Sequence, residues 1–164
     1  MKSIKIIPLS GPIKAKVAIP GSKSYTNRAL LLAALTSNAV KIKNPLVSDD
    51  THSMIACLRE LGISCSFKGE YLEVSGNLQT IADRTYNLNA NLSGTTIRFI
   101  LALSAIIPGE KIIRGRGRLN ERPIAHLIDG LRQLDASIEY VEKEGYPPVR
   151  VLSSRLNPGV VRMK

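Results

Sequence analysis

Aromatic residues are scarce in this 164-residue chain, which has no tryptophan and two phenylalanines. It therefore lacks the aromatic-rich strands on which RNA-binding sheets stack bases, and it shows no zinc-ligand or helix-turn-helix spacing. The alternation of Arg114, Arg116 and Arg118 with glycines keeps nucleic-acid binding as a less favoured alternative. On an extended segment these arginines would share one face. They could belong to a solvated loop, bind a small anion or contact successive phosphates of a nucleic-acid backbone.

Cysteine is equally rare. Cys57 and Cys65 have no metal-ligand spacing with His52 or His126 and are expected to be buried thiols in a reducing cytoplasm rather than a disulfide. No apolar run reaches the length of a membrane span, and residues 1–3 lead into a strand pattern rather than a signal peptide. These features predict a cytoplasmic protein with no membrane partner.

Acidic side chains number 13 against 23 lysines and arginines, a formal net charge of +10. This excess predicts anionic partners without identifying them. The length suits one ordinary domain, and the 44% hydrophobic content is enough to build a core.

The most informative segment is 21–35 (GSKSYTNRALLLAAL), which follows an extended stretch and opens an apolar helix. Ser24 is expected to cap this helix. Lys23 and Arg28 place cations near a helix start, where the helix dipole disfavours them. A bound anion explains both, because backbone N–H groups, hydroxyls, Lys and Arg all bind phosphate or carboxylate. The alternative is an ordinary capped helix with solvated basic residues.

The same pattern recurs at residues 92–103 (LSGTTIRFILAL), where Gly94 and Arg98 have the spacing of Ser24 and Arg28. Matching elements then follow each copy in the same order: a short strand, an amphipathic helix and two further strands. This self-similarity predicts an internal duplication whose units share a core. The expected strands lie at 3–7, 13–19, 40–43, 63–67, 70–74, 110–113, 137–142 and 148–152, and the expected amphipathic helices at 50–61 and 121–134.

The helices at 25–36 and 95–106 are apolar all round, which predicts burial on every face. Asp49 or Asp50 and Asn120 are expected to cap the two amphipathic helices. If the N-termini of the two buried helices converge, the two Ser/Arg clusters form a single anion pocket.

Together these motifs closely resemble the 5-enolpyruvylshikimate-3-phosphate (EPSP) synthase family. Residues 20–35 match its N-terminal signature, with further matches at 48–50, 93–98, 118–124 and 146–148. The resemblance covers essentially the whole chain. The UDP-N-acetylglucosamine enolpyruvyl transferases share the fold, but their signatures differ from these.

The resemblance implies a mixed α/β fold, the enolpyruvyl transferase α/β prism, made of βαβαββ repeats with buried central helices and outer sheets. Family members have two domains of three repeats each. The resemblance implies N-terminal strands at 1–19 that belong partly to the second domain, repeats at 20–90 and 91–157, and the start of a third repeat at 158–164. The rest of the third repeat and the second domain are absent from this sequence.

The implied reaction transfers the enolpyruvyl group of phosphoenolpyruvate to the 5-hydroxyl of shikimate 3-phosphate and releases phosphate, on the pathway to chorismate and aromatic amino acids. The implied partners are these two substrates, and no metal or organic cofactor is implied.

The family's site residues carry over to five positions. Lys23 is expected to contact both substrates and to be the one residue here able to take part in proton chemistry. Ser24 and Arg28 are expected to hold shikimate 3-phosphate. Gly94 is expected to bring its N–H to the phosphoenolpyruvate phosphate, which Arg118 would clamp.

The weaker candidates are Asp50, Asn91 and Thr95. Asp50 is either a helix cap or a residue that contacts the ligand-binding side chains rather than the ligand. The family usually carries Asn directly before the Ser/Ala-Gly-Thr motif, whereas this chain has Leu92 there and its amide one place earlier. Either Asn91 reaches in through a shifted backbone, or an amide contact near phosphoenolpyruvate is lost.

The inhibitor glyphosate would crowd Gly94, so an alanine there is expected to spoil its binding. Arg98 is expected to be structural, and an ion pair with Glu121 or Asp129 is an open alternative for Arg122. The proton-transfer residues of the family's second domain are missing, which predicts a chain that holds substrates but is inactive alone. It is expected to need the missing C-terminal part or to self-associate. The alternative is a free-standing anion-binding or regulatory module.

Overall fold

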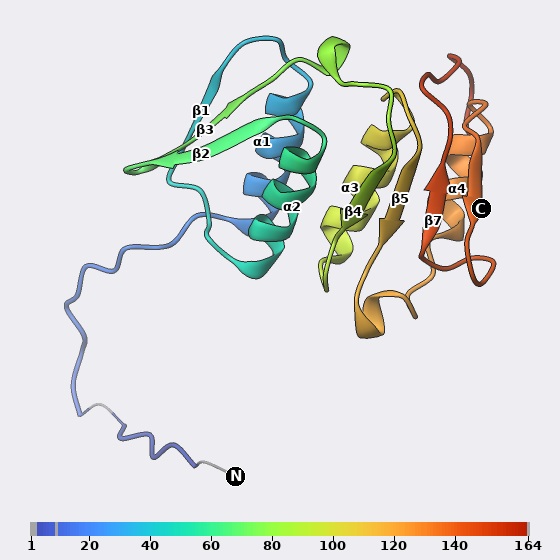
Figure 1. Ribbon diagram of the computed structural model, residues 1–164. Helices are drawn as coiled ribbons and strands as arrows, with labels where there is room; N and C mark the ends of the chain where they lie inside the picture. Colours follow the sequence, from blue (N-terminus) through green and yellow to red (C-terminus); the bar gives the residue numbers. More distant parts are fainter. Residues whose placement is uncertain (1–2, 9, 164) are drawn as a thin grey trace.

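The computed structural model describes residues 3–8 and 10–163 and has a mixed α/β fold (Figure 1). None of the helices in this described part is long and apolar enough to cross a membrane. In chain order the elements are α1 (Lys23–Ala34), β1 (Val40–Lys43), α2 (Asp49–Glu60), β2 (Ser64–Lys68), β3 (Tyr71–Ser75), the 3-10 turn η1 (Leu78–Thr80), β4 (Tyr86–Asn89), α3 (Gly94–Ser104), β5 (Lys111–Arg114), the 3-10 turn η2 (Gly117–Leu119), α4 (Ala125–Arg132), β6 (Ile138–Tyr140) and β7 (Val149–Val151).

The strands form two sheets whose topology repeats. The first sheet has the order β1-β3-β2, and the second has the order β4-β5-β7-β6. In both sheets the last strand of the unit lies in the middle and pairs antiparallel with its neighbours, so β5-β7-β6 repeats β1-β3-β2. The predicted duplication is therefore confirmed in the strand order. The unit boundaries at 20–90 and 91–157 stay predictions, and β4 pairs with the second sheet in parallel to β5.

The core joins the two units. Helices α1, α2 and α3 contact one another, and α2 also packs on β2 and β4 (Figure 1). The buried apolar side chains of both units belong to a single cluster, in which Leu30, Met54 and Leu58 meet Ile97 and Leu101. Burial of such side chains is the main stabilising contribution available to the fold.

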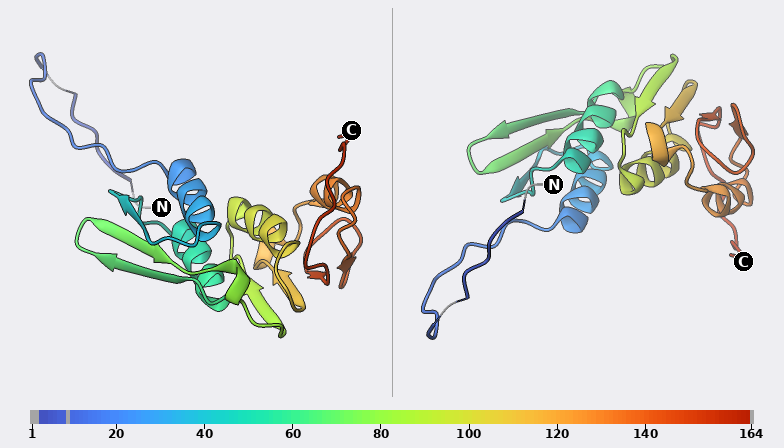
Figure 2. Two further views of the ribbon diagram at one scale, coloured as in Figure 1. Left: turned by 90° about the horizontal axis from the view of Figure 1, so that it is seen from above. Right: turned by 90° about the horizontal axis from the view of Figure 1, so that it is seen from below.

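The predicted strands at 3–7 and 13–19 are wrong in this structure. Residues 3–8 and 10–20 are exposed and extend away from the body as an arm (Figures 1 and 2). A strand needs a neighbour to take its backbone hydrogen bonds, and no described strand lies beside the arm. Residues 1, 2 and 9 of the predicted range 1–19, and residue 164 of the predicted range 158–164, lie outside the described residues.

The helix starts correct two of the predicted caps. Helix α1 begins earlier than predicted, with Ser22 rather than Ser24 as its N-cap. A Cβ on Gly21 would stand 2.9 Å from the Leu46 backbone nitrogen, so only glycine lets the chain enter α1 this close to β1. Helix α2 is capped by Ser48, which forms a reciprocal capping box with Thr51, while the two aspartates occupy its first turn.

Helix α4 is shorter than the predicted 121–134, and Asn120 does not cap it. The N-cap position is Ile124, which has no side-chain cap, and its N–H donates to the Gly145 carbonyl at 2.9 Å. Asn120 instead ends η2 and accepts a hydrogen bond from the Gly115 N–H at 2.9 Å. The backbone N–H at the start of α4 is therefore hydrogen-bonded by a loop about 20 residues further along the chain, and no local sequence pattern indicates such a contact.

The apolar helices are not buried on every face, contrary to the prediction. On α1 and at its C-terminal end, Leu32 is 63% exposed and Leu35 is 47% exposed, and Tyr25 lies on the same exposed stripe. Within the described residues no element covers this side of α1. Helix α3 is more enclosed, although Ile106 just after it is exposed.

Both cysteines are free and buried, as predicted. Burial raises the pKa of the Cys57 thiol to about 12 and that of Cys65 to about 11. Because the thiolate is the reactive form, Ellman's reagent at mildly alkaline pH is expected to label neither thiol in the folded chain. Both should react after unfolding in guanidinium chloride, which serves as the control. Rapid labelling of either thiol without denaturant would contradict this burial.

Candidate functional site

The starts of α1 and α3 lie side by side and form an open groove of about 580 Å³. The sequence predicted this convergence of two Ser/Arg clusters, and the lining confirms it. Among the predicted site residues, the groove brings together Lys23, Ser24, Arg28, Asp50, Gly94 and Thr95, and it also includes Leu92, Arg98, Phe99 and Arg122.

Helix α1 supplies the first side of the groove. Arg28 lies one turn after Ser24, and its Nη1 donates to the Ser24 hydroxyl and, at 3.3 Å, to the Ser24 carbonyl. Lys23 forms an ion pair with Asp50 of α2, with 2.7 Å between Nζ and Oδ2. The first turn of α1 contains no acidic residue, so a ligand here meets two cations, a hydroxyl and the positive end of the helix dipole.

Helix α3 supplies the opposite side. Gly94 is its first residue, after the N-cap Ser93, whose hydroxyl accepts from the Thr96 N–H at 3.2 Å. A Cβ on Gly94 would stand 3.3 Å from Arg122 Nη1 and 3.5 Å from Arg98 Nη1. Glycine therefore keeps open the space between two guanidinium groups, where an anion can approach the backbone.

The arginines around Gly94 have different partners. Arg98 donates to the Gly94 carbonyl at 2.9 Å and to the Pro123 carbonyl at 3.1 Å, which agrees with the structural role expected for it. Arg122 lines the groove and, in the described part of the chain, forms no ion pair with Glu121 or Asp129. The structure therefore does not support the alternative in which Arg122 pairs with one of these carboxylates.

Arg118, the predicted ligand clamp, lies in η2, is exposed and stands outside the lining of the groove. The chain turns at Gly117, whose φ is +47°, so the arginine-glycine segment is not extended throughout. The sequence offered no signal that Arg122 rather than Arg118 would line this groove, because that depends on this turn and on the contact of Arg98 with Pro123.

The comparison with protein families decides the lineage. The sequence model of EPSP synthase (3-phosphoshikimate 1-carboxyvinyltransferase) matches residues 8–164. The chain belongs to the EPSP synthase family.

Its relatives are considerably longer. The 3-phosphoshikimate 1-carboxyvinyltransferase of Colwellia psychrerythraea is 42% identical over 164 residues, which cover 98% of this chain and 38% of the relative. That of Paraburkholderia phytofirmans is 43% identical over 141 residues, covering 86% and 32%. The solved EPSP synthase from Acinetobacter baumannii shares the fold, with a TM-score of 0.79 and 22% identity over 89% of this chain and 34% of that chain. The chain thus spans about a third of the length of these relatives.

Asn91 and Leu92, the two residues before Ser93, have different surroundings in the structure. Asn91 has a positive φ of 49°, and its Nδ2 donates to the Ser53 hydroxyl of α2 at 3.1 Å. It lines a neighbouring groove rather than the one beside Gly94. Leu92, 68% exposed, lines the groove instead. Of the two alternatives, the structure therefore has an apolar side chain at the position of the usual amide.

Charge in the groove is strongly asymmetric. Four side chains of the lining, those of Lys23, Arg28, Arg98 and Arg122, are cationic, and Asp50 is the one carboxylate. Such a concave cationic surface suits a multiply charged anion.

Proposed function

We propose that this chain supplies the substrate-binding surface for enolpyruvyl transfer from phosphoenolpyruvate to the 5-hydroxyl of shikimate 3-phosphate. The observation that carries the proposal is the groove in which two helix N-termini and four cationic side chains face one open space. Both substrates are phosphate-bearing anions. Membership of the EPSP synthase family supports this choice over other small anions.

The two ends of the groove suit the two substrates. Shikimate 3-phosphate is assigned to the α1 side, with Ser24 and Arg28. Phosphoenolpyruvate is assigned to the α3 side, beside Gly94 and Thr95. The guanidinium group of Arg122 lies next to Gly94 and forms no ion pair in the described part of the chain. Lys23 lies at the edge shared by both. Arg118, outside the groove, and Asn91, bonded to α2, remain predictions from the resemblance.

The chemistry needs more than binding. In the proposed reaction the 5-hydroxyl adds to C2 of the enol as C3 is protonated, and the resulting tetrahedral intermediate then loses phosphate together with a proton from C3, which restores the double bond. One group must take the hydroxyl proton and another must protonate C3 of phosphoenolpyruvate. Among the ionisable residues lining the groove, Lys23 is the candidate for either task, because arginine stays protonated and the Lys23 side chain is the more exposed member of its pair with Asp50. We therefore propose that the chain binds substrates without turning them over alone.

The exposed apolar side of α1 indicates a contact surface for a further segment or chain. Tyr25, Leu32 and Leu35 present apolar surface along one helix side. Contiguous apolar surface of this kind marks a contact with another chain segment. We propose that the C-terminal part found in the longer relatives covers it, and that self-association does so in its absence. The free thiols of Cys57 and Cys65 support a cytoplasmic location.

Calorimetry and a phosphate-release assay test the proposal together. We expect the purified chain to bind shikimate 3-phosphate and phosphoenolpyruvate and to release no phosphate from the mixture. Phosphate release at the rate of a complete enzyme would show that the chain is active by itself and would overturn that part of the proposal. Absence of binding, together with salt-sensitive retention of oligonucleotides, would favour the nucleic-acid alternative. Binding of shikimate 3-phosphate by a stable monomer would favour a free-standing regulatory module.

Replacement of Gly94 by alanine is expected to weaken the binding of phosphoenolpyruvate and glyphosate by about tenfold, through overpacking of the ligand space. The added methyl group meets side-chain atoms of Arg122, Arg98 and Leu119, none closer than 3.3 Å, so the melting temperature should change little. Calorimetric titration and thermal denaturation measure the two effects. Gly69→Ala is not a suitable control because of its positive φ, whereas Gly11→Ala, on the arm, has open space around it. Equal affinities in the Gly94→Ala and wild-type chains would contradict the assignment.

A further inference from the structure

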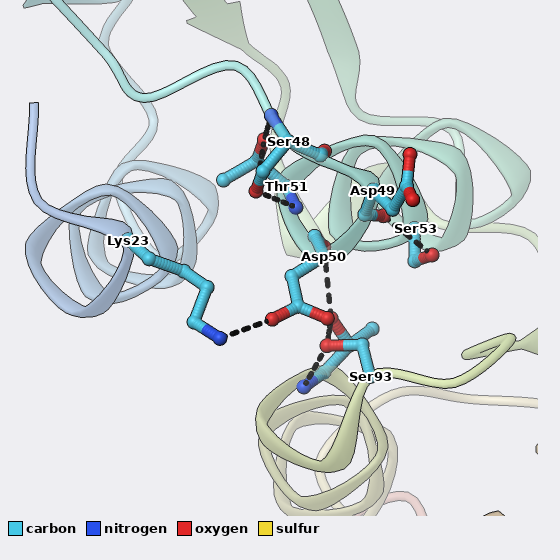
Figure 3. A network of polar contacts seen from close by, with 8 residues as sticks. Lys23, Ser48, Asp49, Asp50, Thr51, Ser53 and Ser93 are labelled. Carbon is cyan, nitrogen blue, oxygen red and sulfur yellow. Dashed lines mark hydrogen bonds and ion pairs between the residues drawn. The ribbon is translucent and has the colours of Figure 1, made fainter. Parts of the chain in front are cut away.

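Asp50 stands out as the one carboxylate in a cationic groove, and its carboxylate contacts Lys23 directly. The ion pair joins α1 to α2 with 2.7 Å between the charged atoms (Figure 3). The side chain of Lys23 is 54% exposed, whereas that of Asp50 is 24% exposed. The carboxylate is thus the better-packed member, and the lysine is the one that can reach a ligand.

The position of Asp50 is fixed by contacts on two sides. Its helix start is locked by the capping box of Ser48 and Thr51. Its backbone carbonyl accepts a hydrogen bond from the Thr96 hydroxyl of α3 at 3.2 Å. Thr96 is fully buried, and its hydroxyl in turn accepts a hydrogen bond from the hydroxyl of Ser93, the N-cap of α3, at 2.8 Å. These contacts tie the starts of α2 and α3 together beneath the groove.

A lysine without a partner would leave its ammonium group mobile. The Lys23 stem has four rotatable bonds, and its place in the first turn of α1 is disfavoured by the helix dipole. A fixed carboxylate removes both problems, because it neutralises the charge and selects the conformers in which the ammonium group points toward the start of α2. A ligand then meets an ammonium group that is already ordered, which lowers the entropic cost of binding.

We propose that Asp50 is a positioning residue that holds the Lys23 ammonium in the groove, directed at the anionic group of the ligand. It acts through Lys23 and does not itself contact the ligand. This inference rests on the proposed function for the identity of the ligand, but the Lys23–Asp50 contact itself does not depend on it.

Removal of the Asp50 charge has opposite expected effects on anion binding under the two possible roles of this residue. If Asp50 acted only through its negative charge, Asp50→Asn would tighten anion binding, because the groove becomes more positive. If it orders Lys23, the same change should weaken phosphoenolpyruvate binding by about two- to tenfold, the cost of ordering one long side chain on binding. Asp49→Asn is the matched control, since it removes the same charge from the same helix turn. Asp49 is exposed and forms no ion pair in the described part of the chain.

A double-mutant cycle with Lys23→Met separates positioning from a merely structural role. In the Lys23→Met background, Asp50→Asn should cause no further loss of affinity, because the group to be positioned is gone. Calorimetric titration with phosphoenolpyruvate measures all four proteins. Tighter binding by Asp50→Asn, or equal losses with and without Lys23, would overturn the proposal.

A second measurement needs no substrate. Acetylation of lysines by an amine-reactive ester, read by mass spectrometry, should modify Lys23 several-fold faster in Asp50→Asn than in Asp49→Asn or the wild-type chain. Equal rates in the two variants would overturn the proposal even if the chain binds phosphoenolpyruvate. Faster labelling in Asp50→Asn with no phosphoenolpyruvate binding in any protein would leave the Lys23–Asp50 contact standing and refute the proposed function instead.

Discussion

Substitution of Lys23 by methionine is expected to weaken the binding of shikimate 3-phosphate and phosphoenolpyruvate by about 100-fold each. Methionine keeps the length and apolar stem of the side chain but removes the charge that both anions share. Loss of a charge-assisted partner at a binding site has an effect of this size. Calorimetric titration with each substrate measures it, and a shared loss distinguishes Lys23 from Arg28, which is assigned to shikimate 3-phosphate alone.

Lys43→Met provides the matched control for charge. Lys43 is exposed at the end of β1, outside the groove, and its replacement changes the net charge by the same amount. A comparable loss of affinity in Lys43→Met would show that the groove attracts anions only through the overall charge of +10. Loss of one substrate but not the other in Lys23→Met would refute the shared position of Lys23.

The second large effect is on stability. Lys111 on β5 is fully buried, and its Nζ donates to the carbonyls of Ile107 at 2.5 Å, Gly109 at 2.7 Å and Ser153 at 2.8 Å. These bonds fasten the segment after α3 to the segment after β7. Lys111→Met leaves three carbonyls without this donor and should lower the free energy of unfolding by about 3 kcal/mol. In a chain of this length the melting temperature should fall by about 6–12 °C.

The internal duplication supplies the control, because β1 is the counterpart of β5 in the first unit and its lysine Lys41 is exposed. Lys41→Met should change the melting temperature little, as surface substitutions usually do. Similar destabilisation by both variants would show that the three buried hydrogen bonds contribute nothing beyond removal of a lysine.

The difference between the wild-type chain and Lys111→Met should also depend on pH. Burial lowers the pKa of Lys111 to about 8, from an ordinary value of 10.5 that unfolding restores. Between these values the unfolded chain binds more protons, so the stability contributed by Lys111 rises with pH across this window. Denaturant titrations at about pH 7 and about pH 9.5 should therefore show a larger difference at the higher pH. A smaller difference there would contradict the direction of the pKa shift.

Local sequence patterns predicted elements better than they predicted ends. The apolar periodicity and turn residues located α1, α2 and α3 and every strand of the two sheets except β4, because those signals are carried by neighbouring residues. The caps at Ser22 and Ser48 were missed. Each cap competes with a similar residue one or two places away, and the choice depends on contacts such as that of Gly21 with the loop after β1.

The candidate site was predicted in part for a related reason. The repeated Ser/Arg motif indicated Lys23, Arg28 and Gly94, since their residue types and spacing already describe an anion site at a helix start. Arg122 could not be chosen over Arg118 from the sequence. Its place beside Gly94 depends on the turn at Gly117 and on the hydrogen bond from Arg98 to the carbonyl of the next residue, Pro123.

By itself, the sequence determined the duplicated series of helices and strands, the surplus of positive charge and the two clusters at the starts of α1 and α3. These properties belong to residues close together in the chain. The tertiary structure decided that the clusters share one groove, that Asp50 pairs with Lys23 and that Thr96 braces Asp50. Such contacts join residues tens of positions apart, and they arise only when burial of the common core brings α1, α2 and α3 together.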